Sequence, residues 1–355
     1  MMRYRRFALT FVIALALFVT GNYVIWKSVT EDLITDRHYD GGDLSRMGYL
    51  PGSKIYRRNT TDLPRRHIRI EEYDGRRVDM ITIGDSFSNG RGGGYNRFYQ
   101  DYIATLNGFD VLNIPRHNDL SPLVSIADLA HSGFLKKTGA RYLLLGVSEK
   151  AWREMAGSDP LGNSLDDTAR QAFKRADYEA ALPRVAFINN GNFKFLLNAL
   201  LYRFSDHAVF SQVYRAQLIK PLFTARDSRT LLYLRYRETP GHEQVVRVND
   251  NLNQLAELLG HQGITLIFMP CVDKYDLYRP YLRSPRYAPG TFFEELRPLP
   301  KRYLFVDTKM ILNDLLLQDE KDVYYPDDTH WSWKASRALA RAIPLQQNAR
   351  KGSAP

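Results

Sequence analysis

The chain has almost no cysteine and no internal repeat. Cys271 is the only cysteine among 355 residues, so no intramolecular disulfide can form. An exported or intracellular domain of this length can rest on its hydrophobic core alone, and we interpret Cys271 as a small buried residue at a strand end. The content of 44% hydrophobic and 25% charged residues is that of a globular protein with one large domain or two smaller ones.

Motifs for several other chemistries are also missing. His242-Glu243 has no second histidine four positions on, which excludes the zinc-protease pattern. The glycine-rich segment 90–94 has neither dinucleotide-binding nor P-loop spacing, and we interpret it as a mobile loop. We therefore predict no cofactor and no metal.

A single long hydrophobic run is present, at residues 7–26. It contains no charge and follows three arginines within residues 3–6. At about 1.5 Å per residue, a helix of this length spans the ~30 Å hydrocarbon core of a bilayer. A cleaved signal peptide is the alternative, but its apolar region is shorter and ends in a small-x-small site, which is absent here. Because Tyr23 and Trp26 also suit the interfacial aromatic belt, we expect an uncleaved single-pass anchor.

Arginines on the short N-terminal side predict that this end stays in the cytoplasm. We therefore expect the chain in the inner (cytoplasmic) membrane, with its body periplasmic or otherwise extracytoplasmic. The net charge of +10 and pI of about 9.5 favour anionic polymers or lipid headgroups as partners. Nucleic acid is not expected outside the cytoplasm. Because the arginines are scattered, a generally basic soluble surface is the alternative interpretation.

Short apolar stretches predict buried strands of a parallel sheet. They lie at residues 78–83, 110–114, 141–147, 264–269 and 303–307. Before the stretch at 264–269, apolar residues recur at helical spacing in 243–260. This segment ends at Gly260, where a helix stop is expected. Alternation of strands and helices predicts a three-layer α/β domain of the flavodoxin-like kind, with its active site at the carboxyl ends of the strands.

The same pattern divides the chain into segments. We predict a cytoplasmic tip and anchor at 1–29, a polar connector at 30–77, an α/β domain at 78–345 and a loose tail at 346–355. Residues 150–240 are too many for one crossover, so we interpret them as a helical insertion or cap. Within it, apolar residues from Phe193 to Phe204 predict an amphipathic helix with Asn192 as its N-cap.

The strongest chemical signal is Gly84-Asp85-Ser86, directly after the first predicted strand. A serine here lies on a tight turn, permitted by Gly84, that we expect to begin a helix. N–H groups and the dipole at a helix start would stabilise a developing oxyanion. The segment is not the Gly-x-Ser-x-Gly elbow of α/β-hydrolases. The alternative is that Asp85 and Ser86 only cap a helix.

A second signal, His330, favours the catalytic interpretation. It follows the last predicted strand and is preceded by Asp327 and Asp328. A histidine with a carboxylate two or three positions earlier is typical of the base and its orienting acid in a triad. Because the carboxyl ends of parallel strands share one edge, we expect His330 beside Ser86.

These segments resemble the SGNH (GDSL-like) hydrolase superfamily, with residues 84–88 as its first block and 328–331 as its last. The stretch 270–278 looks more specifically like the alginate O-acetyltransferase branch, whose members acetylate exported polysaccharides. The resemblance covers about 78–150 and 260–340. It implies a three-layer SGNH fold, a polysaccharide acceptor, and an acetyl donor supplied by a membrane-bound O-acyltransferase partner.

Carried over by position, the resemblance makes Ser86 the nucleophile, His330 the base and Asp328 the orienting acid, with Asp327 as the alternative acid. The serine block precedes the Asp-x-His block here, as in ordinary SGNH hydrolases and unlike the alginate enzymes. The oxyanion glycine and the Gly-x-Asn-Asp block have no match. The Ser86 amide and those of Asn113 and Asn118 are therefore the candidate oxyanion donors.

Further residues near the predicted strand ends are candidates for substrate binding. They are Glu149, Asp273, Lys274, Tyr275 and Trp331. An Asp273–Lys274 ion pair and simple packing of Trp331 are the structural alternatives. Two other functions stay open: an acetyl esterase with the same triad, and a non-catalytic polysaccharide-binding or assembly protein with a degenerate SGNH fold.

Overall fold

The computed structural model describes most of the chain. The described residues are 2–31, 42–50, 57, 59, 61–92, 94–116, 120–161, 186–208, 211–235 and 238–345. The tail predicted at 346–355 lies outside them, as does part of the insertion.

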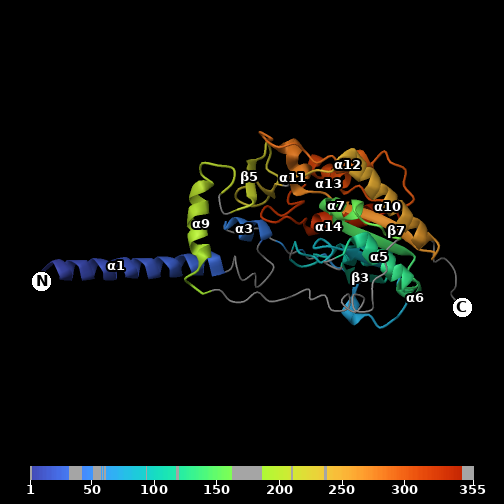
Figure 1. Ribbon diagram of the computed structural model, residues 1–355, viewed down its shortest axis with the longest axis horizontal. Helices are drawn as coiled ribbons and strands as arrows, with labels where there is room; N and C mark the ends of the chain where they lie inside the picture. Colours follow the sequence, from blue (N-terminus) through green and yellow to red (C-terminus); the bar gives the residue numbers. More distant parts are fainter. Residues whose placement is uncertain are drawn as a thin grey trace.

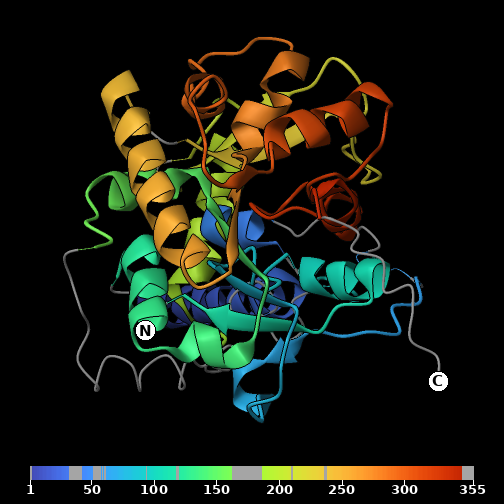
Figure 2. The same cartoon turned by 90° about the vertical axis from the view of Figure 1, so that its right-hand side faces the viewer.

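A six-stranded sheet forms the centre of the protein, and all its neighbouring strands are parallel (Figures 1 and 2). Its strands, in spatial order, are β1 (Ile68–Arg69), β3 (Val111–Pro115), β2 (Met80–Gly84), β4 (Tyr142–Ser148), β7 (Thr265–Cys271) and β8 (Leu304–Phe305). The predicted α/β class and the five predicted strands are confirmed. Within this sheet the prediction missed only β1, since two residues give no recognisable apolar run.

Helices pack on both faces of this sheet (Figure 2). One group is α4 (Tyr99–Asn107), α13 (Thr308–Leu317) and α14 (Trp333–Ala342); the other is α5 (Pro122–His131), α6 (Phe134–Thr138), α7 (Trp152–Ala156) and α10 (His242–Gly260). The prediction of α10 is confirmed, because its apolar stripe, including Val245, Leu252 and Leu259, is fully buried.

Short elements complete the described chain. They are α11 (Lys274–Tyr278), α12 (Phe292–Leu296), the 3₁₀ turns η2 (Ile70–Glu72), η3 (Glu149–Ala151) and η4 (Arg279–Tyr281), and α3 (Asp43–Gly48). Because α3 and β1 both lie within 30–77 and pack on the body, this segment is more than a connector. The insertion contains α9 (Asn190–Leu201), but also an antiparallel hairpin of β5 (Val213–Gln217) and β6 (Thr230–Leu234). The prediction of a purely helical insertion is therefore wrong.

The first helix, α1 (Met2–Ile25), continues into the π-helix η1 (Trp26–Thr30) and projects away from the body (Figure 1). Over Arg3–Thr30 the mean hydropathy reaches 2.1 and none of the apolar stretch is buried. By length and composition this helix is able to cross a membrane. A membrane anchor and a signal sequence both have these properties.

Candidate active site

Three side chains form a hydrogen-bond relay at the carboxyl edge of the sheet. Ser86 follows β2, whereas Asp328 and His330 lie between α13 and α14. His330 Nε2 is 2.7 Å from Ser86 Oγ, and His330 Nδ1 is 2.7 Å from Asp328 Oδ1. The backbone N–H of His330 also donates to Asp328 at 2.9 Å. This is the geometry of a nucleophile, its base and an orienting carboxylate.

Ser86 lies on a turn and not at the start of a helix. The next helix after β2 begins only at Tyr99, so the expected contribution of a helix dipole at Ser86 is wrong. The turn needs Gly84, because a Cβ there would lie 2.0 Å from the carbonyl oxygen of Gly146 on the neighbouring strand. The turn that carries Ser86 can therefore pack closely against the end of β4.

Asp85 fixes this turn through both carboxylate oxygens. The N–H of Phe87 donates to one at 3.1 Å, and the N–H of Ser148, at the end of β4, donates to the other at 2.7 Å. Burial raises the pKa of Asp85, although these two hydrogen bonds oppose the shift. Asp85 thus supplies the capping contacts, while the partly exposed Ser86 hydroxyl is left to contact His330.

The three candidate oxyanion donors differ in their surroundings. Within the described part of the chain, no acceptor lies within hydrogen-bonding reach of the Ser86 N–H. Asn113 lies inside β3, where its Oδ1 accepts from Thr82 at 2.8 Å and Gln100 at 3.0 Å. Its prediction as an oxyanion donor is therefore wrong, and Asn118 lies outside the described residues.

A buried lysine holds the chain that carries Asp328. Lys274 Nζ donates to the carbonyl oxygens of Tyr325 at 2.6 Å, Pro326 at 2.9 Å and Asp328 at 2.9 Å. The side chain is buried and its three hydrogen bonds go to backbone carbonyls, so its prediction as a substrate ligand is wrong. Burial lowers the pKa of Lys274 to about 7, against the opposing effect of the carboxylates of Asp327 and Asp328.

Arg57 separates the roles of the two adjacent aspartates. Its guanidinium forms an ion pair with Asp327, lies 3.5 Å from Asp328 and stacks on the ring of Tyr325 at 4.2 Å. Both the arginine and Asp327 are almost fully buried. Asp328 is therefore the carboxylate that orients His330, while Asp327 anchors the loop through Arg57.

Asp43, at the start of α3, is a second carboxylate beside the imidazole. One of its oxygens accepts the Thr329 N–H at 2.7 Å, the other accepts the Thr329 hydroxyl, and the latter oxygen is 3.5 Å from His330 Nδ1. The first N–H groups of α3 also donate to the Asp327 carbonyl, from Leu44 at 3.0 Å. Sequence reasoning missed Asp43 and Arg57, because an aspartate and an arginine in a polar segment carry no local signal of a distant partner.

The glycines of segment 90–94 pack tightly against this network. A Cβ on Gly92 would lie 2.7 Å from the Trp331 carbonyl oxygen, and one on Gly94 would lie 2.1 Å from that of Arg57. Gly94 also has a φ of 81°, which side chains disfavour. These two glycines therefore allow close packing beside Arg57 and Trp331, while the mobility of the loop stays a prediction.

Asp43, Asp328 and His330 also offer ligand-type atoms within 4.8 Å of one another. Two of these side chains already share a hydrogen bond, and Thr329 donates twice to the third. We therefore interpret the cluster as an acid–base relay, and the absence of a metal or cofactor stays a prediction.

The environment of His330 favours its protonated form. Burial alone would lower its pKa, but the hydrogen bond to Asp328 and the charges of Asp328, Asp43 and Asp85 outweigh burial and raise it. Burial raises the pKa of Asp328, but the hydrogen bond to His330 and the charges of His330 and Arg57 together outweigh it and lower the pKa to about 2. Such a site stabilises the imidazolium that forms when a histidine takes a proton from a serine.

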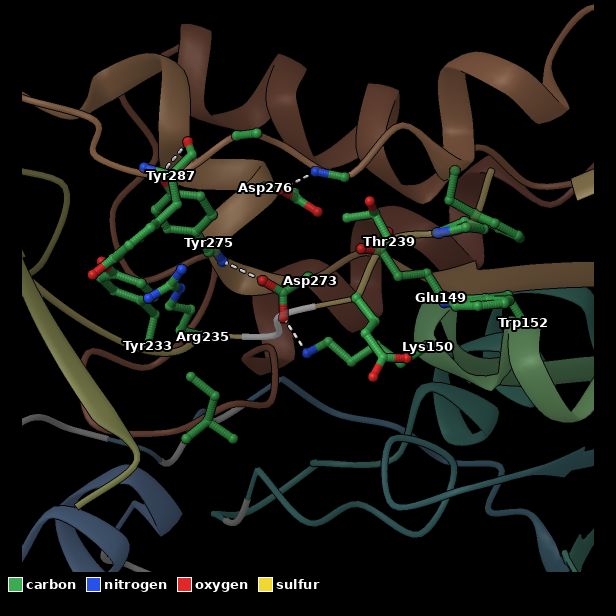
Figure 3. A pocket seen from close by; sticks show the side chains of 16 residues that line it. Glu149, Lys150, Trp152, Tyr233, Arg235, Thr239, Asp273, Tyr275, Asp276 and Tyr287 are labelled. Carbon is green, nitrogen blue, oxygen red and sulfur yellow. Dashed lines mark hydrogen bonds and ion pairs between the residues drawn. The ribbon is translucent and has the colours of Figure 1, made fainter. Parts of the chain in front are cut away.

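Glu149, Asp273 and Tyr275, three of the predicted substrate ligands, line one pocket at the same edge of the sheet (Figure 3). Asp273 pairs with Lys150 and not with Lys274, so the predicted Asp273–Lys274 pair is wrong. The other carboxylate oxygen of Asp273 accepts from the Tyr275 N–H at 2.8 Å, so Asp273 is the N-cap of α11.

Trp331 does not line this pocket. It is 4% exposed, and its ring packs 4.7 Å from that of Phe87, beside the serine turn, and 6.5 Å from that of Tyr99. Its prediction as a substrate ligand is wrong, because packing covers the ring. Trp331 instead supports the position of its neighbour His330.

Replacing Asp43 should shift the pH dependence of activity. A protonated His330 cannot act as base, so kcat/KM for an activated acetyl ester should fall as pH drops through its pKa. Asp43→Asn removes a carboxylate that favours the imidazolium, so the acidic limb should move to lower pH. Asp74→Asn, which changes an exposed carboxylate outside the site, is the control. If the acidic limb of the pH profile of kcat/KM does not move in Asp43→Asn, the Asp43 carboxylate does not raise the pKa of His330.

Replacing Lys274 should destabilise the protein. Lys274→Met leaves three buried carbonyls and nearby carboxylates without their cation, which should cost about 3–5 kcal/mol of unfolding free energy. Lys301 is a matched control, since it also donates to three carbonyls but is partly exposed. Lys301→Met should cost only about 1 kcal/mol. Equal losses in urea unfolding of the two variants would show that burial is not what makes Lys274 important.

Comparisons with known proteins do not assign the chain to a family. No protein-family model matches the sequence, and no curated protein matches it. The resemblance to the SGNH superfamily rests on the short segments 84–88, 270–278 and 328–331. The function is therefore argued from the geometry of the site.

Proposed function

We propose that this chain is a membrane-anchored, extracytoplasmic O-acetyltransferase of the SGNH type, which acetylates a polysaccharide through an acetyl-serine intermediate. The observation that carries the proposal is the Ser86–His330–Asp328 relay, in which the serine and histidine are 244 positions apart in the sequence. A parallel sheet with helices on both faces, and the relay at its carboxyl edge, suits a three-layer SGNH fold. The apolar α1 supports the anchor.

In the first half-reaction Ser86 accepts the acetyl group. Ser86 Oγ attacks the carbonyl carbon of the donor ester while its proton passes to His330 Nε2. The Ser86 N–H donates to the resulting oxyanion. Collapse of this intermediate breaks the bond to the donor oxygen, which leaves with the proton from His330. The products are acetyl-Ser86 and the deacylated donor.

The second half-reaction passes the acetyl group to the polysaccharide. His330 takes the proton of a sugar hydroxyl, whose oxygen attacks the carbonyl carbon of acetyl-Ser86. Collapse then breaks the bond to Ser86 Oγ, and the serine recovers its proton from His330. The acceptor leaves as an acetyl ester and the enzyme is regenerated.

The pocket of Figure 3 is the acceptor site in this proposal. Glu149 follows β4, the strand next to that of Ser86, and the Asp85–Ser148 hydrogen bond joins the serine turn to this wall of the pocket. Aromatic rings and carboxyl groups line it together, which suits the faces and hydroxyls of sugar rings. The aromatic lining residues are Trp152, Tyr233, Tyr275, Tyr287 and Phe292.

Two carboxyl groups of this pocket, Glu149 and Asp276, influence each other. Burial and the nearby Asp276 carboxylate raise the pKa of Glu149 well above its ordinary value, and the two side chains are hydrogen-bonded. Asp276 is held in turn by the Gly290 N–H at 2.8 Å. The pair offers both a donor and acceptors to a sugar hydroxyl.

The anchor explains how a donor is reached. By resemblance, a membrane-bound O-acyltransferase partner would carry the acetyl group to the outer face. An enzyme held in the same membrane by α1 meets this partner without diffusing from solution.

Ser86→Ala should abolish acetyl transfer. Incubated with an activated acetyl ester, the full-length protein in detergent should acquire an acetyl group on Ser86 and pass it to one of a panel of oligosaccharides. Loss of a triad serine lowers kcat by roughly 10⁴- to 10⁶-fold. Ser88→Ala is the matched control, since Ser88 lies in the same turn but contacts Tyr99 at 2.8 Å and Gly146 at 3.0 Å.

Mass spectrometry of protein and sugar separates the alternatives. Ser86-dependent release of acetate for which no sugar competes would replace the transferase by an acetyl esterase. Equal behaviour of wild type and Ser86→Ala would leave Ser86 with a structural role only and sink the catalytic proposal.

Changing Glu149 should slow the second half-reaction alone. Glu149→Ala removes a hydrogen-bonding partner of the acceptor and should slow transfer to sugar roughly tenfold or more. Acetylation of Ser86 should proceed at the wild-type rate. Glu149→Gln keeps a donor toward Asp276 and should retain most of the transfer rate. If Glu149→Ala slows both half-reactions equally, or neither, this pocket is not the acceptor site.

A further inference from the structure

Helix α9 directs its apolar side away from the protein. Its outward residues share one helical face and, with a phenylalanine three residues beyond its end, form what we call the α9 stripe: Phe193, Leu196, Leu200 and Phe204, which are 64%, 53%, 51% and 83% exposed. The opposite side packs on the protein: Asn198 donates to the Gly48 carbonyl of α3 at 2.9 Å, and Tyr202, just after the helix, is 2% exposed. A surface helix of a soluble protein normally exposes polar residues, whereas α9 exposes an apolar face.

The start of α9 is bonded to the end of α1. Asn192 donates to Asn22 Oδ1 at 2.9 Å and accepts from the buried Thr30 hydroxyl at 2.5 Å. Asn192 is therefore not the predicted N-cap; Asn189 caps the helix and accepts from the Asn192 N–H. The hydrogen bonds of Asn192 with Asn22 and Thr30 fix the start of α9 beside the end of the apolar span of α1.

Aromatic rings surround this junction. The ring of Phe187 lies 6.2 Å from that of Tyr23 and 6.5 Å from that of Trp26. Tyrosine and tryptophan at the end of a span are typical of the interface between the bilayer and water. The beginning of α9 thus lies beside the residues that mark this interface on α1.

The stripe faces the side from which α1 arrives. Figure 1 shows α9 running across the end of α1, with α3 on the other side of α9. Because Asn198 faces α3, the opposite face of α9 is directed along α1, away from the body of the protein. A bilayer crossed by α1 would meet the stripe directly.

We propose that α9 lies in the headgroup region of the membrane that α1 crosses, with the α9 stripe against the acyl chains. Amphipathic helices bind interfaces through such a buried apolar face, strengthened by basic residues near anionic lipid. Lys194 and Arg203 adjoin residues of the stripe in the sequence, and Arg203 borders a groove in which Arg286 pairs with Asp206. Lipid is therefore the occupant that the charges and the position favour.

Together, α1 and α9 hold the domain in one orientation on the membrane. A single transmembrane helix alone leaves the domain free to tilt, whereas a second contact across its end does not. The inference rests on α1 as a membrane span and is independent of the chemistry proposed for Ser86.

Lipid quenching tests this contact in the full-length protein. Cys271 is fully buried, so Leu200→Cys provides one accessible thiol for an environment-sensitive dye. The labelled protein is reconstituted into vesicles of phosphatidylcholine and phosphatidylglycerol, with and without lipids spin-labelled on the acyl chain. Leu317→Cys is the matched control, since Leu317 is a 62% exposed leucine on α13.

We expect blue-shifted emission at position 200 that the spin-labelled lipids quench several-fold more than emission at position 317. Adding Leu196→Glu should remove most of this difference, whereas Leu317→Glu should not. Equal quenching at both positions overturns the proposal. A blue shift at 200 without lipid quenching also overturns it, because a protein or a second copy would then cover the stripe. An intact mass that lacks α1 overturns it as well.

Discussion

The ammonium group of Lys274 is the contact on which the candidate site depends. It is buried, and its three hydrogen bonds fix the carbonyls of a chain segment that runs directly into Asp328 and His330. Burying a charge is costly unless every hydrogen is used, as it is here. Arg57 adds a second buried cation against Asp327 and Asp328. Because this loop is fixed, the imidazole of His330 is held where its Nε2 contacts Ser86 Oγ.

The segment before the sheet belongs to the site as much as the motifs do. Asp43 and Arg57 bind the loop from outside, and α3, which begins at Asp43, also holds α9 through Gly48. The relay, the insertion and the end of α1 are therefore joined through one short helix. The charges of Asp328, Asp43 and Asp85 around His330 favour a proton on the imidazole.

Sequence reasoning succeeded where the signal is local. Five strands and α10 follow from apolar periodicity, and the relay follows from two motifs placed at one sheet edge by the parallel topology. It failed where a residue acts through a distant partner. The Arg57–Asp327 pair spans 270 positions, and nothing near Lys274 indicates three carbonyl ligands. The apolar pattern of α9 predicted the helix, but periodicity does not say whether its stripe faces a core or the outside.

The most direct test of the account is the reactivity of Ser86 itself. The full-length protein would be treated with a fluorophosphonate, which reacts with serines activated by a neighbouring base, and the modified peptide mapped by mass spectrometry. The account predicts rapid modification of Ser86 alone, with a rate that rises with pH as His330 loses its proton. No modification, modification of another serine, or a rate at Ser86 no greater than that of an ordinary exposed serine would contradict it.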